Sequence, residues 1–157
     1  IIMKSIKSVL LIILLSTLNF IGCKKDDPDS VACDVVKDNL PLAGNQEVPA
    51  NTSTGMGKLN VSFDTCNNLL RFTITWMELS GNPVGAHIHG TASMGVNASV
   101  KYDFSAAIPK VTSGTFTDTV LVDNVALIKA SLLQDMYYVN IHTATYPGGE
   151  IRGQIDF

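Results

Sequence analysis

The sequence predicts an all-β protein, an antiparallel β-sandwich with Greek-key connections and one short helix. From about residue 40, apolar and polar residues alternate with the two-residue period that is typical of strands with one buried face. Gly, Asn and Pro interrupt this alternation at short intervals, as at 80–83. Seven or eight short strands with such punctuation favour an antiparallel sandwich over a helical or parallel fold.

The first two strands are expected at 58–64 and 70–76, where every second residue is apolar. The pair Asn67-Asn68 between them suits the tight turn of a hairpin. Further strands are expected at 84–90, 98–104, 114–122, 136–143 and 149–156.

The segment 123–134 shows a different period. Val125, Ile128 and Leu132 recur at helical spacing. Asp123 stands before them and is a residue type that caps helix N-termini. We therefore expect a short helix that packs across one end of the sandwich.

Residues 1–22 have the layout of a secretory signal peptide. Lys4 and Lys7 supply a positive start, and the apolar run 9–15 is too short to span a membrane, which takes about 20 residues. The run ends in a small residue before Cys23, which resembles the lipobox of bacterial lipoproteins. This resemblance implies that Cys23 is lipidated and becomes the first mature residue.

Residues 23–39 are expected to form the lipidated start and a polar tether, because the charged beginning of this segment carries too little apolar surface to fold. Lys24-Lys25-Asp26-Asp27 also resembles the export signal that places some lipoproteins on the outer face of the bacterial outer membrane. A solvated linker is the alternative interpretation. We expect a lipoprotein of the outer membrane in the bacterial cell envelope, facing the periplasm or exposed at the surface.

Length and charge limit the domain count and the partners. A chain of 157 residues leaves one domain after the leader and the tether, over residues 40–157. The net charge is −3 and the sequence has no basic cluster beyond Lys24-Lys25, which excludes nucleic acid as a partner. The expected partners are the membrane, through the lipid anchor, and an envelope or extracellular protein or polymer.

Cys33 and Cys66 are expected to form a disulfide. With Cys23 lipidated, they remain as an even pair in an exported protein, where the environment is oxidising. The bond would join the start of the domain to the turn between the first two expected strands.

Polar side chains gather on one face of several expected strands, because side chains alternate between the two faces of a strand. His87 and His89 share a face, with Ile88 turned the other way. The strands at 136–143 and 149–156 are expected to be hairpin partners. Their polar residues, which could lie in one patch with the histidines, are Tyr138, Asn140, His142, Glu150, Arg152 and Gln154.

Four segments of the sequence resemble the CHRD domain, which is named for chordin and occurs widely in bacterial secreted proteins and lipoproteins. The segments span most of residues 40–157 in the order of the family, with a departure at Gly90-Thr91-Ala92 where the family commonly has proline. They are Gly44-Asn45-Gln46-Glu47-Val48-Pro49, Ala86-His87-Ile88-His89-Gly90, Tyr138-Val139-Asn140-Ile141-His142-Thr143 and Pro147-Gly148-Gly149-Glu150-Ile151-Arg152-Gly153-Gln154. The resemblance implies an extracellular or envelope β-sandwich of the immunoglobulin or superoxide-dismutase type, without an assigned biochemical activity.

The polar patch has two interpretations. In the first, it is a structural network in which Arg152 and Glu150 reach the histidines, Asn140 or Glu47 and fix the register of the strands without binding a cofactor. In the second, His87, His89 and His142 hold one copper or zinc ion, with Glu150 as a fourth ligand. The His-x-His pair is similar to that of copper/zinc superoxide dismutases, but a dinuclear site needs more than the three histidines present.

No nucleophile elbow, phosphate-binding loop or zinc-protease helix occurs in the sequence, so we expect no catalytic residues. The sequence thus predicts a lipid-anchored envelope protein whose domain is a non-catalytic binding or structural module without a cofactor. The alternative is a mononuclear copper- or zinc-binding protein. Metal binding is favoured if the three imidazole nitrogens converge within about 4 Å of one another with no Arg152 hydrogen bond between them, and the network is favoured if Arg152 and Glu150 fill that space.

Overall fold

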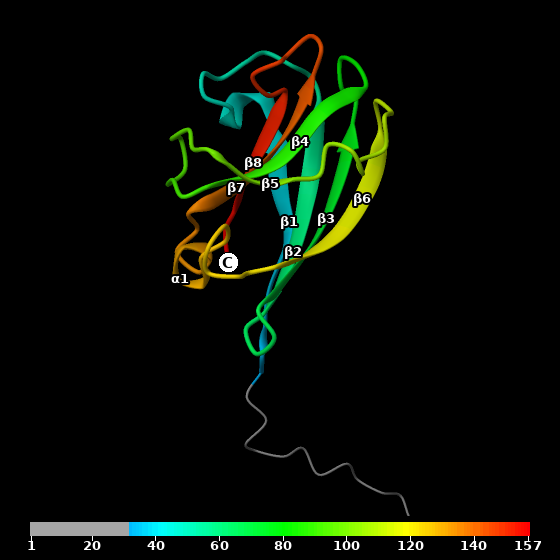
Figure 1. Ribbon diagram of the computed structural model, residues 1–157. Helices are drawn as coiled ribbons and strands as arrows, with labels where there is room; N and C mark the ends of the chain where they lie inside the picture. Colours follow the sequence, from blue (N-terminus) through cyan, green and yellow to red (C-terminus); the bar gives the residue numbers. More distant parts are fainter. Residues whose placement is uncertain (1–31) are drawn as a thin grey trace, which may run out of the picture. The chain divides into compact units, whose positions relative to one another are not determined.

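Residues 32–157 are described by the computed structural model, in which eight antiparallel strands form one strongly curled sheet with one short helix (Figure 1). The expectations for the signal peptide, for Cys23 and for the start of the tether lie outside the described residues. The strands are β1 (Asp34–Ala43), β2 (Met56–Asp64), β3 (Leu69–Met77), β4 (Pro83–Gly90), β5 (Val100–Asp103), β6 (Gly114–Leu121), β7 (Tyr137–Thr143) and β8 (Ile151–Ile155). A 3₁₀ turn (Gly44–Gln46) follows β1, and α1 spans Lys129–Leu132.

The strand order in the sheet is β5-β4-β7-β8-β1-β2-β3-β6. The two end strands approach each other because the sheet curls around its own core (Figure 1). Side chains close the gap between them: the Tyr102 hydroxyl donates to Asp118 over 2.7 Å, and the rings of Phe104 and Phe116 stack with centroids 5.3 Å apart. The expected antiparallel all-β fold is confirmed, as one sheet curled on itself.

The alternation of the sequence places the core inside this curl. Along β3, for example, Leu70, Phe72, Ile74 and Trp76 are buried, and the residues between them face outward. The seven strands expected from the sequence are all observed, with ends that differ by up to two residues.

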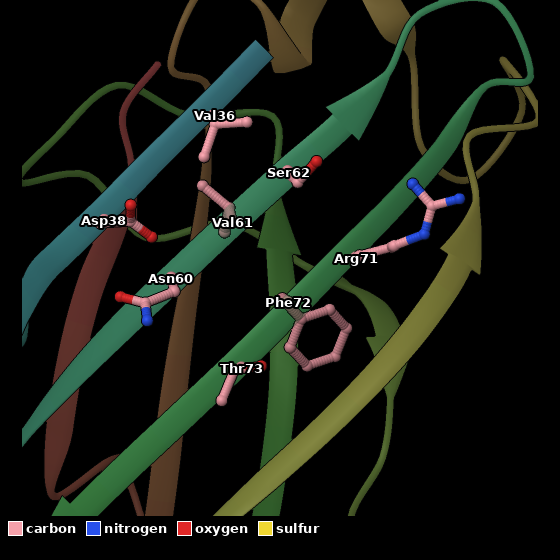
Figure 2. Close-up of a pocket in the computed structure, with 8 residues that line it drawn as sticks. All are labelled: Val36, Asp38, Asn60, Val61, Ser62, Arg71, Phe72 and Thr73. Carbon is pink, nitrogen blue, oxygen red and sulfur yellow. The ribbon is translucent and has the colours of Figure 1, made fainter. Parts of the chain in front are cut away.

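β1 begins inside the segment that the sequence assigned to the tether. The sequence does not alternate over 34–39, and most of these residues are exposed. Their order comes from pairing with β2 at Asp34↔Asp64 through Lys37↔Val61. A bulge follows between Lys37 and Leu40, and it lies beside a shallow hollow of about 140 Å³ on the outer face of β1, β2 and β3 (Figure 2). Backbone pairing thus determines this strand, which side-chain periodicity could not reveal.

The helix is shorter than the sequence suggested. α1 covers only Lys129–Leu132, and Val125 is 81% exposed, so the apolar spacing from residue 125 does not mark one buried face. Asp123 accepts the backbone N–H groups of Val125 and Ala126 and closes a turn ahead of the helix. Within the described residues, no helix is long and apolar enough to cross a membrane.

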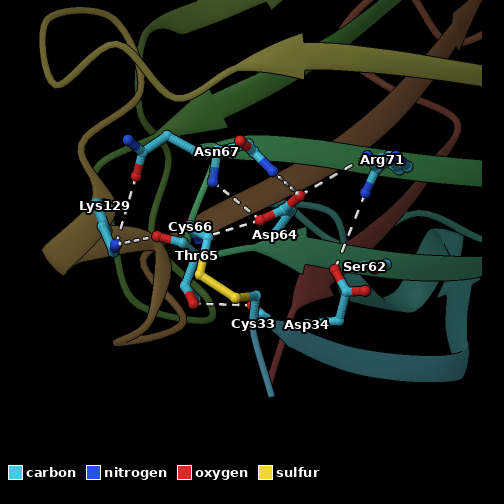
Figure 3. Close-up of a disulfide and its surroundings, with 10 residues drawn as sticks. Cys33, Asp34, Ser62, Asp64, Thr65, Cys66, Asn67, Arg71 and Lys129 are labelled. Carbon is cyan, nitrogen blue, oxygen red and sulfur yellow. Dashed lines mark hydrogen bonds and ion pairs between the residues drawn. A yellow bond between two sulfur atoms is a disulfide. The ribbon is translucent and has the colours of Figure 1, made fainter. Parts of the chain in front are cut away.

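The expected disulfide joins Cys33 to Cys66, where the chain enters the sheet (Figure 3). The same corner is tied by hydrogen bonds around the β2–β3 turn. Asp64 accepts the backbone N–H groups of Cys66 and Asn67, and Lys129 donates to the carbonyl of Thr65 over 2.7 Å. The bond therefore holds the start of β1 against the hairpin turn and the helix.

Replacing both cysteines with serine should lower the free energy of unfolding by about 3–4 kcal/mol, because a crosslink over a loop of this size restricts the unfolded chain. Urea denaturation of the oxidised protein and of the variant measures the difference. Chemical reduction of the unsubstituted protein should give a similar loss. A variant as stable as the oxidised protein would contradict the expected role of the bond.

Candidate functional site

The candidate site lies on the face of β4, β7 and β8 opposite the core. In the sheet, His87 on β4 is paired with Asn140 on β7, and Asn140 is paired in turn with Arg152 on β8. Ile88 and Val139 face the core, so their neighbours along the strands face the other way. The predicted pairing of β7 with β8 and the shared face of the histidines with Asn140 are confirmed.

The three histidines, called here the histidine cluster (His87, His89 and His142), direct one ring nitrogen each toward a common centre. His87 Nδ1 lies 3.1 Å from His142 Nε2. The Nε2 atoms of His142 and His89 lie 3.0 and 3.1 Å from the side-chain oxygen of Asn140. One nitrogen from each of the three rings lies within 4.8 Å of the other two.

The opposite ring nitrogens are held by fixed acceptors. His89 Nδ1 donates to the carbonyl of Ala98 over 2.9 Å, and His142 Nδ1 donates to the carbonyl of Pro147 over 3.0 Å. Because a carbonyl oxygen can only accept, each of these Nδ1 atoms carries the proton of the neutral ring. His87 Nε2 lies 3.2 Å from the hydroxyl of Ser105 and 3.7 Å from Asp103. The inner nitrogens of His89 and His142 are therefore left with free lone pairs, whereas the Ser105 hydroxyl can donate to or accept from His87 and does not fix its tautomer.

Burial keeps two of these rings neutral. Desolvation lowers the pKa of His87, and the neighbouring His142 lowers it further. Desolvation likewise lowers the pKa of His89, although its hydrogen bonds to Ala98 and Asn140 oppose the shift. Neutral imidazoles at neutral pH are the form that binds metal ions.

A glycine makes room for the cluster. Gly85 pairs with His142 across the sheet, and a Cβ atom at this position would lie 3.2 Å from His87 Cε1 and 3.3 Å from His142 Cδ2. A larger residue would press the two rings apart.

Arg152 lies beside the cluster and not within it. Its guanidinium carbon is 3.4 Å from the centre of the Tyr138 ring, whose other neighbour, His89, stacks parallel to it at 4.8 Å. The guanidinium donates to the carbonyl of Val96 and to the side chain of Asn97 over 2.9 and 3.1 Å. Arg152 thereby fastens the segment between β4 and β5 over the outer face of the sheet.

Glu47 joins the site through Asn140 and is the most perturbed carboxyl beside it. The residue is 6% exposed, and its Oε1 atom has no hydrogen-bond partner. Burial raises its pKa to about 7, although the charge of Arg152 and a hydrogen bond with the Asn140 side chain partly oppose the shift. Gly149 has a positive φ of 127° and leaves space for the carboxyl, since a Cβ there would lie 2.3 Å from Oε1.

Glu150 is directed away from the histidines, contrary to the expectation that it would reach them or act as a fourth ligand. Its carboxylate accepts the hydroxyls of Ser53 and Ser80 and the backbone N–H of Ser80, each over 2.7 Å, and also the hydroxyl of Thr143. Glycine at 148–149 lets the chain turn just before Glu150, so the two-residue period of β8 does not extend back to it. This completely buried carboxylate instead ties the 53–55 and 79–81 loops to β7.

A second group of potential ligands, Cys33, Cys66 and Asp64, also comes together in the described residues. Both sulfur atoms are used in the disulfide, and Asp64 Oδ1 accepts two backbone N–H groups (Figure 3). These three residues therefore hold the β2–β3 turn and are not offered as ligands.

Sequence reasoning found the histidines, Asn140, Glu47 and Arg152 but missed the groups that orient them. Ser105 follows β5, and the carbonyls of Ala98 and Pro147 belong to loops. No motif in the sequence marks a backbone carbonyl as a partner of a histidine. The sequence places Gly85 two positions before His87 but does not predict that it makes room for the rings of His87 and His142.

Comparison with known proteins gives one family. The model of the CHRD domain matches residues 39–155, which covers nearly all of the described chain. No curated protein and no solved structure gives a significant match.

Changing Glu150 to Gln should lower the free energy of unfolding at neutral pH. It should also reduce the loss of stability that the protein shows as the pH falls. Burial alone would raise the pKa of Glu150, but the hydrogen bonds from Thr143, Ser80 and Ser53 outweigh it and hold the pKa below 4.5. The carboxylate therefore contributes stability that is present above about pH 4.5 and is lost as the pH falls through the lowered pKa. Urea denaturation between pH 3 and 7 should show a steeper acid loss for the unsubstituted protein than for Glu150→Gln, and parallel curves would contradict this role.

Proposed function

The chain belongs to the CHRD domain family, and we propose that it uses this fold to hold one copper or zinc ion in the histidine cluster. The observation that carries the proposal is that the two nitrogens of each ring have different surroundings. The outer nitrogens are held by Ala98, Pro147 and the Ser105–Asp103 pair, and the inner nitrogens converge, those of His89 and His142 with free lone pairs. Metal-binding histidines characteristically donate their other N–H to a carbonyl or carboxylate, which orients the ring.

The chemistry of the site favours copper or zinc over other common ions. Imidazole nitrogen suits both metals, with bonds of about 2.0–2.1 Å for zinc, so that neighbouring ligand atoms lie roughly 3–3.5 Å apart. The 3.1 Å between His87 Nδ1 and His142 Nε2 falls in this range. In the absence of an ion, a proton on His87 Nδ1 would join the same two nitrogens as a hydrogen bond, and the ion would replace that proton.

The competing structural network receives less support. Arg152 acts on Glu47 through its charge, as the network requires, but its hydrogen bonds go to Val96 and Asn97. Glu150 binds serine and threonine groups, so neither residue fills the space among the histidines. The domain on this proposal is a non-catalytic binding module. Association with an envelope protein or polymer remains the second candidate function if no metal binds.

We also propose that this module is exported and anchored to the outer membrane of the bacterial envelope by lipid on Cys23. The support comes from the sequence of residues 1–25 and from the Cys33–Cys66 disulfide, which suits an oxidising compartment.

The purified protein should bind one equivalent of Cu²⁺ or Zn²⁺, and His87→Ala or His142→Ala should each abolish stoichiometric binding. Isothermal titration without reductant measures this while the disulfide remains closed. The matched control is Arg71→Gln on the outer face of β3 (Figure 2). β3 does not pair with any strand of the cluster, so this variant should bind like the unsubstituted protein.

Two results would contradict the metal proposal. The first is a protein that binds neither ion. The second is equal binding by the unsubstituted protein and both histidine variants, since the ion would then lie elsewhere.

Changing Cys23 to Ser should release the protein from membranes, because a lipid chain on this residue is the proposed anchor. Fractionation of a bacterial host and metabolic labelling with a fatty acid measure this directly. A variant that stays labelled, or an unsubstituted protein that is never labelled, would refute the anchor without affecting the metal proposal.

A further inference from the structure

The carboxamide of Asn140 stands where the histidine cluster converges. Its oxygen lies 3.0 Å from His142 Nε2 and 3.1 Å from His89 Nε2, and its side chain also adjoins His87. Nitrogen and oxygen atoms this close are normally joined by a hydrogen bond, in which one of the two atoms carries the proton. The protons of His89 and His142 are on the opposite nitrogens, and an amide oxygen carries none.

The inner nitrogens of His89 and His142 and the oxygen of Asn140 therefore meet as acceptors with no hydrogen among them, and the Nδ1 of His87 joins them as an acceptor when the proton of that ring is on Nε2. A single cation resolves this arrangement, because all four atoms have lone pairs to donate. The distances of 3.0, 3.1 and 3.1 Å between neighbouring atoms also match the edges of a coordination shell whose bonds are about 2.0–2.2 Å long.

We infer that the side-chain oxygen of Asn140 is the fourth ligand of the metal ion. The inference rests on the proposed function, and it changes the ligand set from three nitrogens to three nitrogens and one neutral oxygen. Glu150, the carboxylate expected from the sequence to complete the site, is used elsewhere.

The sheet holds Asn140 in this position. The residue is 2% exposed and lies at the centre of β7, between its cross-strand partners His87 and Arg152. Behind the carboxamide lies the side chain of Glu47, which interacts with it. Such support on the far side of a ligand orients the donor atom toward the metal.

The carboxamide also has a second use in the ion-free protein. Turned over, its NH₂ group presents two hydrogens, one for the Nε2 of His89 and one for that of His142. The lone pairs are then satisfied without a cation. The structure has the other orientation, with the oxygen toward the histidines and the NH₂ group toward Glu47, and this is the orientation that coordination of an ion requires.

This ligand set predicts which ions the site prefers. Nitrogen and neutral oxygen ligands suit Cu²⁺ and Zn²⁺, whereas Cu⁺ prefers the sulfur ligands that this set lacks. The affinity for Cu²⁺ or Zn²⁺ should exceed that for Mg²⁺ or Ca²⁺, which take shells made of oxygen.

The test compares the unsubstituted protein with Asn140→Leu and Asn140→Asp. Asn140→Leu fills the space but removes the oxygen, so affinity for Zn²⁺ should fall at least roughly tenfold. Asn140→Asp keeps an oxygen in the same place and should bind at least as tightly as the unsubstituted protein. Electron paramagnetic resonance with Cu²⁺ should show a changed hyperfine splitting in the leucine variant, since its oxygen ligand is lost.

The outcomes separate this inference from the metal proposal. No binding by the unsubstituted protein would refute both. Binding by the unsubstituted protein with the same affinity and spectrum in Asn140→Leu would refute only the fourth ligand. If Asn140→Leu does not fold, as judged by thermal unfolding, Asn140→Asp decides: loss of binding in that folded variant overturns the inference, and retained binding with a shifted spectrum supports it.

Discussion

The pairing of β7 with β4 on one side and β8 on the other is the constraint on which the site depends. Backbone hydrogen bonds fix which residues lie opposite one another, so His87, Asn140 and Arg152 form a row across three strands. A slip of one residue in either pairing would turn the polar side chains of one strand toward the core. The apolar neighbours Ile88, Val139 and Ile151 oppose such a slip because each is completely buried.

Polar side chains on a covered face of a sheet need hydrogen-bond partners within the protein. The loops that cover this face supply those partners. Arg152 fastens the segment between β4 and β5, and the carbonyl of Ala98 in that segment receives the proton of His89. On the other side Pro147, in the β7–β8 turn, accepts from His142. The covering loops thus satisfy the outer nitrogens while leaving the inner ones unprotonated. Loss of either loop would free the rings to turn.

The sequence predicts those parts of the structure that follow from periodicity and from residue type. The strands β2 to β8 have alternating or punctuated runs, and Cys33 and Cys66 are the two cysteines of the described residues. It could not predict β1, whose first half lacks alternation and is ordered by its neighbour. Glu150 was assigned to the histidine face because alternation was extended through a turn in which Gly149 has a positive φ. The carbonyl partners of the histidines depend on loop paths, which no residue pattern encodes.

The structure also separates the point of attachment from the histidine cluster. β1 begins next to the disulfide at Cys33 and ends at Ala43, which pairs with Arg152 at the level of Asn140. Ten residues of strand span about 33 Å. Residue 32 therefore lies at the end of the sheet remote from the cluster. The disulfide and the β2–β3 turn hold this end of β1, and the pairing of β4, β7 and β8 holds the cluster, so the two ends of the domain are fixed by different contacts.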